Sequence, residues 1–235
     1  MEHAGPLPLA CRRYQNGAFQ ELSDLVSPEV PVFVRFPGRP DTRLWAYPVD
    51  LAGLALGHAR IEWCAPGEEP VLTGREDSLY ILDVRPAAPA GAADWPAPMA
   101  APSVLATMQS FISSCGLWDG TGCFHRAAAY DPASGAFLAR AEDIGRHNCL
   151  DRLAGWALGA GQDLGRLALF VSARITASLM DKARRAGFRV LVSRSAVTTA
   201  SVDAAREHGL TLIGFARSEE ARFTVFNDER GWVRP

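Results

Sequence analysis

The sequence lacks several features that mark particular classes of protein. No apolar run approaches the roughly 18 residues needed to cross a bilayer. The N-terminus has no basic start followed by a long apolar stretch, so we expect no signal peptide. The net charge is −2 and the pI is about 6.2, which argues against a general nucleic-acid-binding or membrane-surface protein.

Common phosphate and zinc motifs are also missing. There is no G-x-G-x-x-G and no G-x-x-x-x-G-K-[ST], so we expect neither a Rossmann dinucleotide site nor a P-loop. There is no H-E-x-x-H, and no H-x-E followed by P-C-x-x-C. The second absence disfavours a zinc deaminase. We expect no structural metal.

Lysine is scarce, and cysteine pairs are absent. Of the 24 basic residues, only Lys182 is a lysine. The scarcity of lysine indicates either a genome that favours arginine codons, or a role of Lys182 that needs a compact ammonium group and that a planar guanidinium group cannot fill. The cysteines are odd in number, scattered and without a C-x-x-C: Cys11, Cys64, Cys115, Cys123 and Cys149. They favour reduced thiols in the cytoplasm over a disulfide framework.

The 235 residues, of which 48% are hydrophobic, suit one large domain or one domain with a smaller lobe. We predict a β-rich N-terminal lobe (1–85), a Pro/Ala-rich linker (86–102) and an α/β domain (103–235). Within the lobe, residues 1–28 read as a loose leader with at most one short strand. A hairpin (30–36 and 42–47), a short helix (50–59) and further strands (61–84) follow.

Strands and helices alternate in the C-terminal part. Strands are predicted at 167–172, 189–193, 211–215 and 223–226, and helices at 176–186 and 197–208, with Gly187 and Gly209 where the helices stop. This order predicts a mainly parallel sheet with helices on both faces. Ligands of such sheets lie beyond the carboxyl ends of the strands, where the sequence places Ser172, Arg174, Ser195 and Thr199.

The segment 121–151 combines the most polar chemistry. An apolar run, a turn at 131–135 and a second apolar run predict a hairpin, which would bring His125 and Cys123 close to Asp143, Arg146 and His147. A helix is predicted from residue 148 onward. Because helix N-termini favour anions, we expect an anionic ligand here. The histidines could be metal ligands, acid–base groups or polar anchors; hydrogen bonding to a phosphate or purine is favoured.

The same residues carry a family resemblance. TGCFHRAAAYD, AEDIGRHNCLDRLAG, VSARITASLMDKARRAGFRVLVSRSAVTTASVDAAREHGLTLIGFAR and RFTVF resemble, in order, blocks of the FdhD family of formate dehydrogenase accessory proteins. The resemblance implies a sulfurtransferase that passes sulfur from a cysteine desulfurase to a molybdenum cofactor carrying guanine dinucleotides, for formate dehydrogenase or a related molybdoenzyme. It also implies a cytidine-deaminase-like fold without zinc and a homodimer. The charge and composition predict no nucleic-acid or membrane partner.

Motif matching assigns the cofactor-binding candidates: Thr121, Gly122, His125, Asp143, Gly145, Arg146, His147, Ser172, Arg174, Lys182, Ser195 and Thr199. The family carries sulfur on a C-x-x-C loop that would fall within residues 85–102, where this chain has no cysteine. Arg126 also stands where the family has a small residue, and it could close or recharge the pocket.

Two hypotheses therefore remain for the chemistry. The first is a sulfurtransferase-like accessory enzyme in which Cys115 or Cys123 is catalytic, since a transferring thiolate needs an accessible, electropositive position. Cys149 falls on a helix, where packing is expected. The second is a non-catalytic relative that binds the cofactor, or a guanine nucleotide, as a carrier or chaperone. Uptake of persulfide sulfur by a cysteine would separate the two.

Overall fold

The computed structural model describes residues 5–87 and 94–235. The N-terminal elements are β1 (Leu7–Gln15), β2 (Ala18–Val26), β3 (Val30–Arg35), β4 (Thr42–Ala46), α1 (Leu51–Glu62), β5 (Glu68–Glu76) and β6 (Leu79–Pro86). Part of the predicted linker, residues 88–93, lies outside the described residues. After it come β7 (Met99–Ala100), α2 (Ala101–Ser113) and α3 (Trp118–Thr121).

The C-terminal part follows the predicted order of elements. These are β8 (His125–Asp131), β9 (Ala136–Asp143), α4 (Arg146–Ala160), β10 (Ala168–Val171), α5 (Ala177–Ala186), β11 (Val190–Ser193), α6 (Thr199–Glu207), β12 (Thr211–Arg217), β13 (Arg222–Asn227) and β14 (Val233–Arg234), with 3-10 turns at Leu164–Arg166 and Ser218–Glu220. α5 ends at Gly187, whose φ of 106° requires glycine, as predicted.

The central sheet is mixed rather than mainly parallel, so that prediction is wrong. Its strand order is β13-β12-β11-β10-β8-β9. Only β10–β11 and β11–β12 are parallel, whereas the other three pairings are antiparallel. The reason lies in the connections. Helical crossovers link β10, β11 and β12, but short turns join β8 to β9 and β12 to β13, and such turns connect antiparallel strands.

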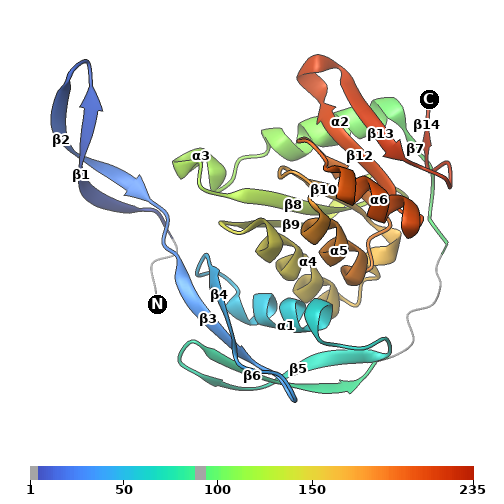
Figure 1. The fold of residues 1–235 in the computed structure, drawn as a ribbon, viewed down its shortest axis with the longest axis horizontal. Helices are drawn as coiled ribbons and strands as arrows, with labels where there is room; N and C mark the ends of the chain where they lie inside the picture. The colour runs from blue at the N-terminus through green and yellow to red at the C-terminus, as the bar shows by residue number, and fades with distance from the viewer. Residues whose placement is uncertain (1–4, 88–93) are drawn as a thin grey trace.

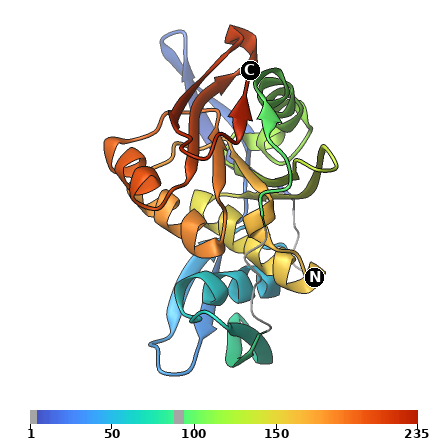
Figure 2. The same ribbon diagram turned by 90° about the vertical axis from the view of Figure 1, so that its right-hand side faces the viewer.

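Helices cover both faces of this sheet, and strand alternation divides the core between them (Figures 1 and 2). Ala127 and Ala129 of β8 join the cluster that contains the buried residues of α4, α5 and α6. Ala128 and Tyr130 join a second cluster, which contains the buried residues of α2. The chain is thus a mixed α/β protein with a core on each side of one sheet.

A second sheet, with order β4-β3-β6-β5, is formed by the N-terminal part, and α1 packs between it and α4 (Figure 1). The predicted pairing of β3 with β4 is confirmed. α1 and α4 cross at glycines: a Cβ added to Gly57 would lie 1.7 Å from the backbone oxygen of Asp151, and one added to Gly155 would lie 2.0 Å from that of Gly53. The two helix backbones are therefore in contact.

The predicted loose leader is instead a long hairpin. β1 and β2 pair over nine positions around a turn at Asn16 and Gly17, both with positive φ. The hairpin stands away from the rest of the molecule in Figure 1, and its residues are exposed except for the half-buried Cys11 and Leu22. Within the described ranges, no helix is both long and apolar enough to cross a membrane.

Candidate functional site

The predicted β8–β9 hairpin is present and returns to its starting point. His125, the first residue of β8, pairs with Asp143, the last residue of β9. Two residues later Gly145 is the N-cap of α4, and Arg146 is its first helical residue, two positions earlier than predicted. The register therefore brings His125 to the start of α4, where the sequence predicted an anion.

Three basic side chains gather there: His125, Arg146 and Arg174, which we call the cationic cluster. His125 is half-buried, and its pKa is held below the ordinary value chiefly by burial and further by the positive charges of Arg146 and Arg174. Among residues 5–87 and 94–235, no carboxylate lies within ion-pair distance of either arginine. The cluster therefore holds positive charge that its neighbours leave uncompensated.

Two helices begin beside this charge. Neither the N-cap of α4, Gly145, nor that of α5, Thr176, caps its helix through a side chain. His147, in the first turn of α4, contacts the Ser178 hydroxyl of α5 through Nε2 at 3.2 Å. Burial, followed by Arg146 and Lys182, lowers the pKa of His147. Free helix N–H groups and unpaired guanidinium groups together form a suitable setting for phosphate oxygens.

The predicted hydroxyl residues lie at the same edge of the sheet. The Ser172 hydroxyl accepts a hydrogen bond from the backbone N–H of Arg126 at 3.0 Å, next to His125. Ser195 donates to the backbone oxygen of Ser172 at 2.9 Å. Thr199 is exposed at the first position of α6. These bonds hold the ends of β8, β10 and β11 together. The hydroxyls of Ser172 and Ser195 are therefore engaged in hydrogen bonds to backbone groups.

Some predicted site residues have structural partners instead. Asp143 is fully buried, lies 2.6 Å from Arg152 and accepts a hydrogen bond from Asn148. Lys182 is buried against Asp151, with Nζ 2.7 Å from its carboxylate. Thr121 contacts the hydroxyl of Ser27 at 2.8 Å. Gly122 ends α3 in a left-handed conformation with φ of 68° and open space around it.

The three cysteines of this region differ in access. Cys115 and Cys123 are both exposed. Cys149 is buried as predicted, and its Sγ contacts the backbone oxygen of His125 at 3.4 Å. Burial raises the pKa of the Cys149 thiol well above its usual range. Cys115 and Cys123 therefore remain the accessible thiols of the region.

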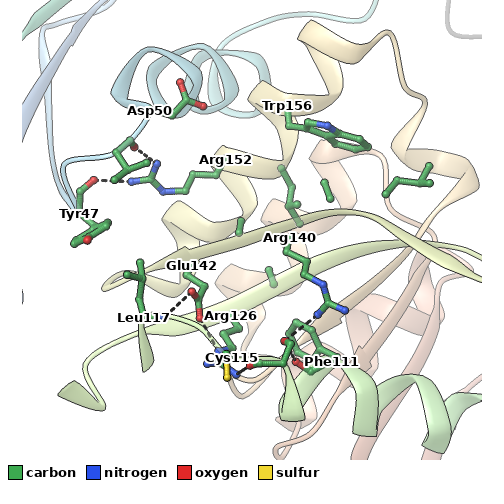
Figure 3. Close-up of a pocket in the computed structure, with 17 residues that line it drawn as sticks. Tyr47, Asp50, Phe111, Cys115, Leu117, Arg126, Arg140, Glu142, Arg152 and Trp156 are labelled. Atoms are coloured by element: carbon green, nitrogen blue, oxygen red, sulfur yellow. Dashed lines mark hydrogen bonds and ion pairs between the residues drawn. The ribbon is translucent and has the colours of Figure 1, made fainter. Parts of the chain in front are cut away.

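A second site, which the sequence did not suggest, is a pocket of about 780 Å³ along strand β9 (Figure 3). We call it the β9 pocket. Its walls include Cys115, Arg140, Glu142, Arg152 and Trp156. These residues come from three separate segments, and the pocket as a whole is lined by β9 residues from both faces of the strand. Cys115 was predicted as a candidate thiol, but no sequence motif links it to the other four residues, which explains why they were missed.

Arg126 does not enter the cationic cluster, and the expectation that it could close that site is not met. Strand alternation turns it to the opposite face from His125. There it is buried, donates to Glu142 at 2.6 Å, and donates to the backbone oxygens of Ile112 and Ser114 at 3.0 and 2.9 Å. Its guanidinium group therefore stabilises the loop that carries Cys115. In the described ranges, no group of three or more metal-ligating side chains is present.

Comparison with known proteins identifies relatives of this chain. Sulfur carrier protein FdhD of Chromobacterium violaceum is 32% identical over 254 residues, which cover 91% of this chain and 93% of that protein. Protein FdhD of Methanocaldococcus jannaschii is 36% identical over 115 residues, or 49% of each chain. The match to the archaeal protein thus spans about half its length, whereas the match to the bacterial protein is nearly complete.

A solved structure and a family model agree with these relatives. A crystal structure from Desulfotalea psychrophila, described as that of a formate dehydrogenase accessory protein, superposes with a TM-score of 0.79, covering 96% of this chain and 98% of that one. At 22% identity this likeness shows a shared fold. The model of the FdhD/NarQ family matches residues 74–231, which is more than half of the chain. The chain therefore belongs to the FdhD/NarQ family.

Proposed function

We propose that this protein carries sulfur for the maturation of formate dehydrogenase or a related molybdoenzyme, and that its cationic cluster binds the guanine-dinucleotide molybdenum cofactor that receives the sulfur. The names of its relatives support the general role. The observation that carries the binding site is the convergence of His125, Arg146 and Arg174 at the uncapped starts of α4 and α5.

The chemistry of this site matches the phosphates of a dinucleotide. Guanidinium groups bind phosphate oxygens in a two-pronged manner, and the first N–H groups of a helix point towards bound anions. Burial is the main cause of the lowered pKa of His125, and the crowded positive charges of Arg146 and Arg174 lower it further. A bound phosphate would relieve that crowding, so these residues favour an anionic ligand over a neutral one.

Sulfur would be carried by Cys115 or Cys123, since both are exposed and Cys149 is buried. We take a cysteine desulfurase as the donor and a homodimer as the working form. The alternative, a non-catalytic carrier or chaperone, is favoured by the absence of a C-x-x-C anywhere in the chain. A persulfide found on either exposed cysteine after incubation with a desulfurase would exclude that alternative.

The binding site is tested by titrating the protein with GDP, which presents the guanine and phosphate groups of the cofactor. Arg146→Ala and Arg174→Ala should each weaken binding about 10-fold to 100-fold, because a hydrogen bond to a charged group contributes about 1.5–3 kcal/mol. Arg43→Ala is the matched control, since Arg43 is exposed like Arg174 and contacts the ring of Trp45 instead of a carboxylate. Unchanged affinity in both cluster variants would refute the site.

A further inference from the structure

We propose that the β9 pocket is where sulfur is received: an extended segment of a donor protein docks along strand β9 and transfers the outer sulfur of its cysteine persulfide to Cys115. This inference rests on the proposed sulfur-carrier function and deepens it. It assigns the receiving thiol, the docking surface and the form of the partner. The site is separate from the cationic cluster, because His125, Arg146 and Arg174 do not line the pocket.

Cys115 is held on a fixed turn at one end of the pocket. The residue before it, Ser114, accepts a hydrogen bond from Arg126 through its backbone oxygen at 2.9 Å. The residue after it, Gly116, donates its backbone N–H to Asp119 at 2.8 Å. Leu117 donates its backbone N–H to Glu142, also at 2.8 Å. The hydrogen bonds of its neighbours on both sides therefore fix the position of the exposed thiol. Cys115 lines the pocket, whereas Cys123 does not.

Strand β9 offers an open edge to the same pocket. It is the last strand of the central sheet, and in the described part of the chain it pairs only with β8. The pocket lies along its residues 138–142. An edge strand presents backbone N–H and C=O groups that an extended peptide can pair with, so the partner that fits is a segment in strand conformation.

The charges in the pocket indicate what this segment carries. Arg126 is paired with Glu142, and Arg152 with Asp143. Arg140 contacts the Ser114 hydroxyl at 3.2 Å and lies over the ring of Phe137 at 4.2 Å, and within the described ranges no carboxylate pairs with it.

This guanidinium group thus lies beside the residue that precedes Cys115. Its positive charge stabilises the Cys115 thiolate before transfer and the donor thiolate that leaves afterwards. The carboxylate of Asp50 lies towards the other end of the pocket in Figure 3, where it caps α1.

Apolar surface beyond Arg140 provides the docking area. Leu138 is 39% exposed on β9, and the half-buried Trp156 of α4 lies at the end of the pocket away from Cys115 in Figure 3. Val49, which is 44% exposed, adds to this wall. A segment that covers these side chains would bury them from water while its persulfide reaches Cys115.

The transfer step needs no oxidant or reductant. The Cys115 thiolate attacks the outer sulfur of the donor persulfide, R–S–SH. A new S–S bond forms at Cys115 with the electron pair of the attacking thiolate. The donor S–S bond breaks, and its electron pair leaves with the donor as R–S⁻. The products are Cys115–S–SH and the donor thiolate, so one sulfur atom with its proton has moved and the charge is conserved.

The test uses the full chain, a cysteine desulfurase loaded with cysteine, and mass spectrometry of every cysteine with time. Leu138→Asp should slow transfer to Cys115 at least 10-fold, because a carboxylate in the apolar wall opposes docking of the donor segment. Leu72→Asp is the matched control: Leu72 is 38% exposed on the edge strand β5, outside the pocket, and its variant should transfer at the original rate. Free cysteine persulfide should label Cys115 in both variants at the original rate, since it needs no docking.

Each of three outcomes would contradict a different part of the proposal. Equal transfer from the desulfurase to Leu138→Asp and to the unchanged protein would overturn the docking surface. Sulfur on Cys123 alone, retained in Cys115→Ser, would overturn the assignment of Cys115 and leave the sulfur-carrier function standing. Sulfur on no cysteine would remove the proposed function itself.

Discussion

Replacing Lys182 with methionine should destabilise the protein far more than the same change at its neighbour Arg185. The Lys182 ammonium lies 2.7 and 2.8 Å from the two carboxylate oxygens of Asp151 and 3.4 Å from Glu62. The Lys182 and Asp151 side chains are only 6% and 1% exposed. Without the ammonium, the buried Asp151 carboxylate would keep only one basic partner among the described residues, His58 at 3.5 Å, which is a cation only when protonated.

The expected magnitudes differ because the two basic residues differ in burial. Removing one partner of a buried ion pair costs about 3–5 kcal/mol. For a chain of this size, that corresponds to a fall in Tm of about 6–20 °C. Arg185 is 34% exposed and pairs with the carboxylates of Glu62 and Asp181. Pairs of this kind contribute about 0–1 kcal/mol, so Arg185→Met should lower Tm by only a few degrees.

Urea unfolding followed by circular dichroism measures both free energies of unfolding. A double variant, Lys182→Met with Asp151→Leu, should recover most of the lost free energy of unfolding, because it removes the unpaired buried carboxylate as well as the cation. Lys182→Arg should also destabilise the protein, since a planar guanidinium replaces a compact ammonium in a closed space. A loss below about 1 kcal/mol in Lys182→Met would refute this account of the chain's only lysine.

Lower pH should tighten nucleotide binding through His125. Its pKa in the free protein lies below the ordinary value of 6.5, and a bound phosphate would raise it, so binding takes up a proton and the affinity for GDP should increase from about pH 8 to about pH 6. Calorimetric titrations should show this dependence lost in His125→Gln, and a steep dependence in that variant would contradict the assignment. Gly57→Ala should destabilise the protein by about 1–3 kcal/mol or more, because the added Cβ meets the backbone oxygen of Asp151. Gly159→Ala on α4 faces open space and should be neutral or stabilising, and equal urea midpoints for these two variants would show that the helix contact is not tight.

Much of the C-terminal half could be predicted because its signals are local. Gly187 marks the end of α5, and the apolar stripe of α4 places Cys149 in the core. The turn between β8 and β9 was enough to predict that His125 lies near Asp143, and the structure pairs the two residues directly. The start of α4 at Arg146 is within two residues of the predicted start.

Errors arose where partners are distant in sequence or where a signal was overlooked. The order of the elements does not fix strand direction towards the edges of the sheet, so the antiparallel pairings of β8 with β10 and of β13 with β12 were missed. The pairing of Lys182 with Asp151 joins residues 31 positions apart, and no periodicity encodes it. Asn16-Gly17 is a strong hairpin signal. It was overlooked because the strands on either side of it are exposed and show no core-facing alternation.

The crossing of α1 with α4 bears on where the folding unit begins. The family model starts at residue 74, inside β5, so a protein trimmed to the matched region would begin there. Such a protein would lack Gly53 and Gly57, and the contact surface on α4 would open to water. It would also lose the backbone oxygens of residues 45 and 47, which accept hydrogen bonds from Asn148 and Arg152. The helix that carries Arg146 would lose its support, so the trimmed protein should forfeit nucleotide binding together with stability.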